Sequence, residues 1–214
     1  MLNGRGQEGR LRVGIVASMA SGFAHDLLLS FAQAHPELEL EVAEGLPREK
    51  IGGVRSLALD FAIVTGMPSS PGCEVETLWH ERVTVALPAN HALAARREIS
   101  WEELVQERFI VSRVDPGPEI QDYIIRGLAE LGRHPDVEQL AVQRETLLAL
   151  VGLGRGLSLV AEAEAGVVYP GVIFLPLDHK EIPFSFVWSE QNDNPAFRRF
   201  LSAARVQALE RRKG

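Results

Sequence analysis

Four small hydroxyl side chains lie at the ends of predicted strands, where they could bind a polar ligand. Ser18 and Ser21 stand between the apolar stretch Val13 to Val16 and a following helix. Thr65 ends a second apolar stretch and Ser112 ends a third. In open α/β sheets, ligands bind at the carboxyl ends of strands, near helical N–H groups that lack partners. We therefore expect all four to contact a ligand. The alternatives are that Ser21 caps the helix and that Thr65 and Ser112 form turns.

The sequence contains no recognisable catalytic or metal-binding arrangement. Its histidines are scattered without an HExxH motif, no serine lies in a Gly-x-Ser-x-Gly motif, and Cys73 is the single cysteine. The glycines at 152, 154 and 156 superficially resemble a phosphate-binding loop. They close a predicted helix and precede a strand, whereas a dinucleotide site needs glycines after a strand and before a helix. We expect no enzymatic activity, no metal and no cofactor.

Composition excludes several further classes of protein. The 214 residues carry a net charge of −7 and no block of five or more basic residues, so we expect the chain not to bind nucleic acid by itself. No apolar run approaches the roughly 20 residues of a membrane-spanning helix, and we expect no membrane partner. Residues 1–10, MLNGRGQEGR, lack the apolar core of a secretion signal and are predicted to be a leader or linker stub. Together with the single cysteine, this favours a cytoplasmic protein.

The first third of the chain alternates strands with helices. Apolar or alternating stretches predict strands at 13–16, 37–42 and 59–66, and helical periodicity predicts helices at 22–34 and 50–57. Strands that interleave with helices in this way form a parallel sheet. The positions of Ser18, Ser21 and Thr65 therefore follow from a βαβαβ unit.

A second unit of similar type follows Pro88, where a fourth strand ends. Its predicted elements are a short helix with a Ser100/Glu103 capping box, strands at 109–112, 136–142, 157–161, 172–177 and 184–188, and helices ending at Gly132 and Leu153. A last helix starts with Asn194 as N-cap and Pro195 as first residue. We predict an α/β fold of two lobes, residues 11–86 with 188–214 and residues 87–187. Two hinge crossings join the lobes into a clamshell that binds its ligand between them.

Two predicted helices carry more apolar surface than one sheet can cover. Leu28 and Leu29 extend the apolar face of the first helix, and Leu148 and Val151 belong to a helix that is apolar on nearly every side. We expect these four residues to form a homodimer interface through a twofold contact. Burial under a loop of the same chain is the alternative.

Several stretches, in order, resemble the regulatory domain of LysR-type transcriptional regulators. They include LRVGIVAS, LDFAIVTG, LWHERVTVALPANHALA and ETLLALVGLGRGLSLVA. The resemblance implies a periplasmic-binding-protein-like (type 2) fold, effector contacts at the four hydroxyl residues and at Gly45 and Leu46, and a dimer through the two helices named above. The N-terminal helix-turn-helix domain of that family is absent from these 214 residues. DNA binding is therefore implied only for a longer parent protein.

These observations predict a domain that senses a small, anionic effector and relays its binding through dimer geometry to a DNA-binding domain. Helix N-termini would be the partners of the anion, because the lining side chains are mostly neutral. A solute-binding protein for uptake of a small organic anion shares the same architecture and is the alternative. An enzyme on this scaffold is a second alternative, because a fold alone does not fix function.

Overall fold

A computed structural model describes residues 9–16, 21–114 and 116–211 of the chain. The chain forms two compact units, the first reaching to His80 and resuming at Ile182, the second comprising Glu81–Glu181. The strands β4 (Cys73–Pro88) and β8 (Val172–Ser189) contain the two boundaries, so each runs from one unit into the other. The structure thus has two crossings inside strands, and both unit boundaries lie before the predicted ones at 86/87 and 187/188.

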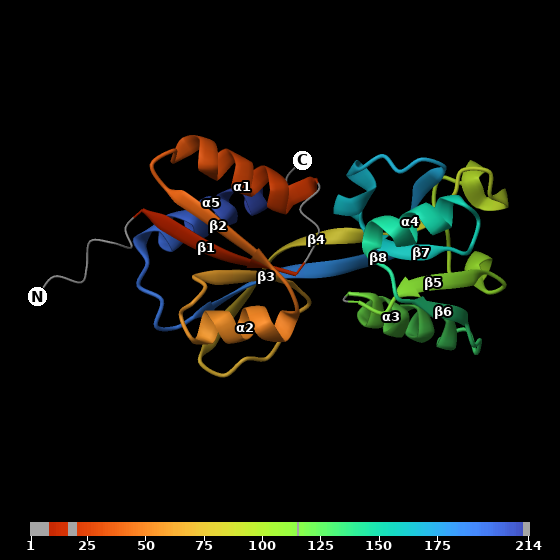
Figure 1. The fold of residues 1–214 in the computed structure, drawn as a ribbon, viewed down its shortest axis with the longest axis horizontal. Coiled ribbons are helices and arrows are strands. Elements are labelled where there is room, and N and C mark those ends of the chain that lie inside the picture. The colour runs from red at the N-terminus through yellow and green to blue at the C-terminus, as the bar shows by residue number, and fades with distance from the viewer. Residues whose placement is uncertain (1–8, 17–20, 115, 212–214) are drawn as a thin grey trace, which may run out of the picture. The chain divides into compact units, whose positions relative to one another are not determined.

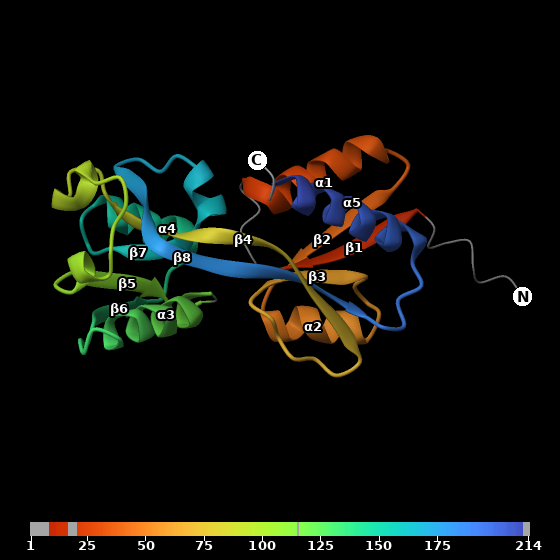
Figure 2. The same cartoon turned by 180° about the vertical axis from the view of Figure 1, so that it is seen from behind.

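The first unit is a twisted sheet with helices on both faces (Figures 1 and 2). Its elements are β1 (Arg10–Ile15), α1 (Gly22–Ala34), β2 (Glu39–Glu44), α2 (Pro47–Arg55), β3 (Phe61–Thr65), the unit's parts of β4 and β8, and α5 (Pro195–Arg211). The strand order is β2-β1-β3-β8, with β1 parallel to both neighbours and β8 antiparallel to β3. The predicted βαβαβ unit is confirmed.

The alternation of side chains along β3 explains the two layers of helices. Ala62 and Val64 face the α2 side, where they pack with Val54 and Val187. Phe61 faces the opposite side, where its ring stacks on Phe197 of α5 at 5.2 Å between centroids. Successive strand residues point to opposite faces, so a strand with apolar residues at every position requires cover on both.

The last helix closes the first unit as predicted. The side chain of Asn194 accepts a hydrogen bond from the N–H of Ala196 at 2.9 Å, which caps α5. Phe197, Phe200 and Leu201 are buried against the sheet. Phe200 makes edge contact with Phe31 of α1, so α1 and α5 share one aromatic core.

The second unit is built on a parallel pair and an antiparallel pair of strands. Its elements are the remainder of β4 and β8, β5 (Arg108–Ser112), α3 (Gly117–Ala129), β6 (Asp136–Leu140), α4 (Arg144–Gly152), β7 (Ser158–Ala161) and the 3-10 turns η1 (Ala92–Ala95), η2 (Glu102–Leu104) and η3 (Glu162–Gly166). β5 pairs with β6 in parallel and β4 with β7 antiparallel. The predicted short helix after Ser100 is a 3-10 turn, in which the Glu103 carboxylate accepts a hydrogen bond from the Ser100 N–H.

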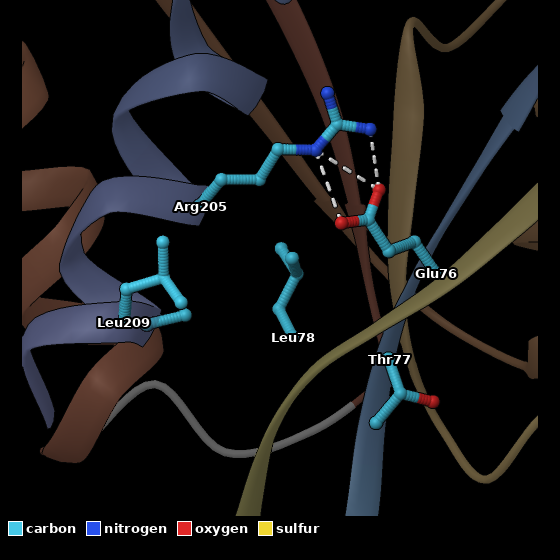
Figure 3. A pocket seen from close by; sticks show the side chains of 6 residues that line it. Glu76, Thr77, Leu78, Arg205 and Leu209 are labelled. Carbon is cyan, nitrogen blue, oxygen red and sulfur yellow. Dashed lines mark hydrogen bonds and ion pairs between the residues drawn. The ribbon is translucent and has the colours of Figure 1, made fainter. Parts of the chain in front are cut away.

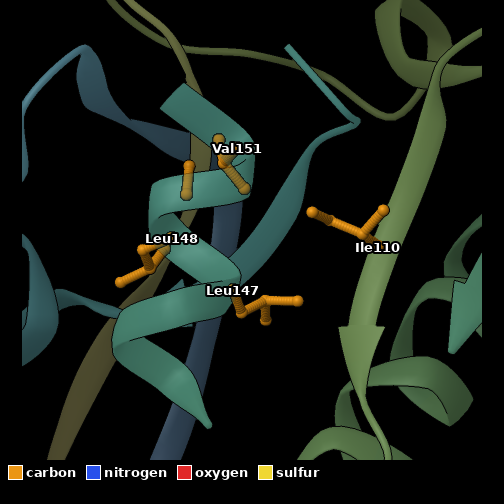
Figure 4. Close-up of a cluster of buried hydrophobic side chains, with 5 residues drawn as sticks. Ile110, Leu147, Leu148 and Val151 are labelled. Atoms are coloured by element: carbon orange, nitrogen blue, oxygen red, sulfur yellow. The ribbon is translucent and has the colours of Figure 1, made fainter. Parts of the chain in front are cut away.

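The core of the second unit corrects part of the predicted dimer interface. Leu148 and Val151 of α4 are 0% exposed and pack with Leu147, Ile110 and Ala86 of the same chain (Figure 4). Leu28 of α1 is likewise buried, whereas Leu29 is 48% exposed. The expectation that all four side chains reach a partner-facing surface is wrong for the three buried ones. The chain's own core accounts for the apolar character of α4, and Leu29 alone stays available.

Two further observations concern the ends of elements. The strands predicted at 172–177 and 184–188 form one continuous strand, β8. The glycines after α4 act as predicted: Gly154 has φ +77° and its N–H bonds the carbonyl of Val151, which ends the helix.

Candidate functional site

The carboxyl ends of three parallel strands meet at one edge of the first unit. In the register of the sheet, Ile15 lies opposite both Glu44 and Ile63. The N–H of Val16 bonds the carbonyl of Ile63 at 3.1 Å, and the N–H of Gly45 bonds the carbonyl of Ile15 at 3.2 Å. The segments that follow the strands therefore start side by side. They contain Ser21, Gly45–Leu46 and Thr65, which the sequence predicted as ligand contacts.

Ser21 occupies the N-cap position of α1 with an extended backbone, φ −160° and ψ −171°. Its side chain makes no capping hydrogen bond, so the alternative that it acts only as a helix cap does not describe its geometry. Ser18 lies outside the described residues. Ser21 thus marks the start of α1, the helix that follows β1 in the chain, where helical N–H groups lack intrahelical partners.

The second segment brings a cation that the sequence analysis missed. Leu46 is the N-cap residue of α2 and Pro47 its first residue. Lys50, one turn into α2, lies with its ammonium nitrogen 3.0 Å from the point where a Cβ on Gly45 would stand. A carboxylate oxygen of Glu49 is 3.1 Å from the same point. Among the described residues, Lys50 makes no ion pair.

The absence of side chains at two glycines is the signal that could have found Lys50. Gly14 of β1 also lies under the lysine, because a Cβ there would stand 3.1 Å from two of its methylene carbons. The stem of Lys50 thus crosses β1 over Gly14 and delivers its charge near Gly45. Long charged side chains often bury their stems in this way.

Thr65 ends β3 and is half-buried. Its backbone pairs with Phe184 of β8, and Gly66 follows with φ +78°, a conformation that glycine adopts without strain. Within the described part of the chain, the Thr65 hydroxyl makes no hydrogen bond. Its hydroxyl proton is therefore not committed to any of the described residues.

Ser112 differs, although it also ends a parallel strand. Its hydroxyl donates to the carbonyl of Val142 at 2.6 Å and accepts from the N–H of Val114 at 2.9 Å. A serine hydroxyl has one proton, so Ser112 as placed has none left for an anion. Its geometry fits the turn-forming alternative. Ser112 belongs to the second unit, whereas the residues described above belong to the first.

The second unit buries a group of ionisable side chains around Glu164. The Glu164 carboxylate forms an ion pair with Arg144 at 3.0 Å and accepts a hydrogen bond from the Tyr169 hydroxyl at 2.5 Å. Burial, and then the bond to Glu164, raise the pKa of Tyr169 above its usual range. The Glu164 side chain is only 4% exposed, although the alternating Ala and Glu residues at 161–165 are typical of a solvated turn.

A groove of about 260 Å³ lies between β4 and α5 of the first unit (Figure 3). Its lining residues are Glu76, Thr77, Leu78, Arg205, Ala208 and Leu209. Arg205 bonds Glu76 with two nitrogens, the shorter contact being 2.6 Å, and this hydrogen bonding raises the pKa of Arg205. The charge of Arg205 is thus already neutralised by Glu76.

Metal sites and membrane-spanning helices have no counterpart among the described residues. No group of three or more His, Cys, Asp or Glu side chains in the described ranges could hold a metal ion. No helix in the same ranges is both long and apolar enough to cross a membrane.

Comparison with known families and proteins gives consistent matches. The family model described as LysR substrate binding domain matches residues 4–208. The transcriptional regulator TtuA of Agrobacterium vitis is 28% identical over 86% of this chain and 63% of its own length. The regulator XapR of Escherichia coli K12 is 28% identical over 94% of this chain and 68% of its own length. The chain thus spans about two thirds of these relatives.

Solved structures show the same fold. The full-length regulator CbnR, in complex with its target DNA, superposes with a TM-score of 0.83 at 19% identity over 95% of this chain and 72% of its own. The effector-binding domain of BenM with its effector benzoate superposes with a TM-score of 0.82 at 21% identity. The match covers 94% of this chain and 93% of that domain's own length. The α/β, periplasmic-binding-protein-like architecture predicted from the sequence is confirmed.

Proposed function

Because the chain belongs to the family of LysR substrate-binding domains, we propose that it senses a small anionic effector for a transcription regulator. The observation that carries this proposal is the carboxyl edge of the first unit. There the uncommitted hydroxyl of Thr65, the start of α1 at Ser21 and the ammonium of Lys50 follow adjacent parallel strands. Hydroxyl and N–H donors together with one cation suit a carboxylate.

The proposed site consists of Ser21, Gly45, Leu46 and Thr65, with Lys50 added and Ser18 kept from the sequence prediction. Ser112 is left out because its proton is committed to Val142. Gly45 contributes by lacking a side chain, since a Cβ there would displace the end of the Lys50 side chain from its position. The α2 helix starts at Leu46–Pro47, so its first N–H groups add to the donors at this edge.

Titration calorimetry of the 214-residue chain with benzoate and its neutral analogue benzamide tests this proposal. Benzoate is chosen because it is the effector of the BenM domain. We expect benzoate to bind and benzamide to bind at least about tenfold more weakly, because a charge-assisted hydrogen bond is worth about 1.5–3 kcal/mol. Thr65→Val should weaken benzoate binding by a similar factor.

If benzoate does not bind, a panel of aliphatic and aromatic carboxylates follows in the same assay. Failure of the whole panel, or equal binding of acids and their amides, would contradict an anion site. The relatives described above are transcriptional regulators, which favours sensing over the alternative of solute uptake.

We also propose that the parent protein is a dimer that binds DNA through a domain outside these 214 residues. The family relatives are longer than this chain, and CbnR binds its target DNA as a full-length protein. Leu29, with 48% of its surface exposed, is the one predicted contact that still reaches the surface. Sedimentation equilibrium of Leu29→Asp should show a weaker dimer than the native chain, and an unchanged dimer would remove α1 from the interface.

A further inference from the structure

A pair of hydroxyl groups connects the end of β3 to both strands that leave the first unit. The Ser185 hydroxyl of β8 donates to the carbonyl of Gly66 at 2.7 Å. The hydroxyl of Thr77, on β4, lies 2.9 Å from the Ser185 hydroxyl. β4 and β8 are neighbours in the sheet, so the chain of contacts runs across three adjacent strands.

The direction of the protons along this chain is fixed. Ser185 has one proton and gives it to Gly66, so Thr77 must be the donor in its contact with Ser185. The order is therefore Thr77 to Ser185 to the Gly66 carbonyl. In Figure 3, the Thr77 hydroxyl points away from Arg205 and the groove, which is consistent with its commitment to this chain.

The buried position of Ser185 indicates that its hydroxyl has a structural role. Ser185 is 0% exposed and lies between Phe184 and Phe186 on a strand that is otherwise apolar here. Burying a hydroxyl costs free energy unless it is bonded, and an apolar side chain would avoid that cost. The bond that Ser185 makes goes to the residue directly after Thr65.

Gly66 needs such a partner because of its backbone conformation. With φ +78°, the chain turns out of the β3 ladder at this residue. The N–H of Gly66 still reaches the carbonyl of Pro183 at 2.8 Å, while its carbonyl accepts from a side chain. Two bonds to β8, one to each of the peptide groups that flank the Gly66 Cα, thus fix the main chain that carries Thr65.

We infer that Thr77 and Ser185 are positioning residues: they hold Thr65 in place for its ligand and fasten it to both crossing strands. This inference rests on the proposed function for the part that concerns the ligand. The positional part stands on the hydrogen bonds alone. Ligand contact at Thr65 would then act on β4 and β8 through two hydroxyl bonds.

Amide hydrogen exchange, measured by NMR on the whole chain, tests the positional part without a ligand. We expect Ser185→Ala and Thr77→Val to speed exchange at the Gly66 amide on the order of fivefold to tenfold, because each removes a hydrogen bond of ordinary strength. Thr77→Ser keeps the hydroxyl and should restore the native rate. Native Gly66 exchange in both Ser185→Ala and Thr77→Val would overturn the inference.

Thr84→Val is the matched control. Thr84 lies on the same strand, is buried, and donates its hydroxyl to the carbonyl of Val160 at 3.2 Å. It should lose a comparable hydrogen bond while leaving Gly66 exchange unchanged. Equal acceleration at Gly66 in this variant would mean that general destabilisation, not positioning, causes the effect.

Benzoate titration of the same variants tests the part that concerns the ligand. We expect Thr77→Val to weaken benzoate binding about fivefold and Thr77→Ser and Thr84→Val to leave it unchanged. Native affinity in Thr77→Val, together with faster Gly66 exchange, would overturn the link to the ligand. If the native chain does not bind benzoate, that result counts against the proposed ligand, and the exchange data still decide the positioning role.

Discussion

Thr65 and Ser112 occupy corresponding places in the two units, each as the last residue of a strand in a parallel pair, yet their hydroxyls differ. The Ser112 hydroxyl donates to the carbonyl of Val142 and also accepts a hydrogen bond from the N–H of Val114. Thr65 makes no such bond among the described residues, and the neighbouring carbonyl of Gly66 is held by Ser185 instead. In the first unit, Ser185 holds the main chain, and a different residue, Thr65, has the hydroxyl without such a bond. In the second unit, Ser112 itself holds the main chain.

The two units also differ in where their charged groups lie. In the first unit, the ion pair of the buried Asp60 with the partly exposed Arg12 lies before the start of β3, at the opposite end of that strand from Thr65. In the second unit, Arg144 and Tyr169 are both bonded to the Glu164 carboxylate. Polar substitutions in the second unit should therefore lower stability, and those at the carboxyl edge of the first should lower affinity.

The largest expected loss of stability is for Glu164→Gln. Removing the charge of a buried carboxylate leaves Arg144 without its partner and should cost about 3 kcal/mol in the free energy of unfolding, measured by urea titration. Glu162→Gln is the control, because this nearby glutamate is exposed and should change stability by less than about 0.5 kcal/mol. Equal effects of the two substitutions would refute the structural role of Glu164.

Ser112→Ala is expected to have the next largest effect. It removes a donor to Val142 and an acceptor for Val114, at a cost of about 1–3 kcal/mol in unfolding free energy. Thr65→Val should cost about 0.5 kcal/mol or less, because its hydroxyl has no partner among residues 9–16, 21–114 and 116–211 to lose. Urea titration of both variants checks the comparison directly, and a larger loss at Thr65 than at Ser112 would break it.

The loss of folding stability at alkaline pH should depend on Tyr169. Its pKa in the folded chain is raised, so the folded state holds the proton more tightly than the unfolded state. That contribution is complete below about pH 10, the ordinary pKa of tyrosine, and is lost as the pH rises above it. Urea midpoints at about pH 9 and pH 11 should fall more steeply for the native chain than for Tyr169→Phe. Parallel declines would count against this assignment.

Lys50→Met is expected to have the smallest effect on stability and a selective effect on binding. Methionine keeps an unbranched stem over Gly14 and removes only the charge. Benzoate affinity should fall about fivefold, and the unfolding free energy should change by less than about 0.5 kcal/mol. Lys180→Met, at a position in the second unit, is the matched control and should leave affinity unchanged. A loss of stability without a loss of affinity would assign Lys50 to packing.

Much of the first unit could be predicted because its sequence patterns are local. The apolar stretch at β3 and the Asn194–Pro195 signal of α5 each specify an element through neighbouring residues. Thr65 could be placed at a strand end for the same reason. Lys50 could not, because its position depends on two glycines, one of them 36 positions earlier in the chain, that lie under its stem.

The incorrect predictions share a physical cause. Leu148 and Val151 have the pattern expected of a partner surface, but residues of β4 and β5 cover them in the chain itself. Periodicity reports how apolar a helix is, not which segment packs against it. The stretch AEAEA likewise gives no sign that Glu164 is buried, because its partners Arg144 and Tyr169 are brought to it only by the fold.

The two crossings within β4 and β8 also make the second unit an insertion in the first. During synthesis from the N-terminus, residues 81–181 are complete while the first unit still lacks the end of β8 and all of α5. Phe61 then has neither Phe186 nor Phe197 to pack against. The inserted unit can therefore finish folding on the ribosome first, and the domain that contains both ends of the chain is the last to close.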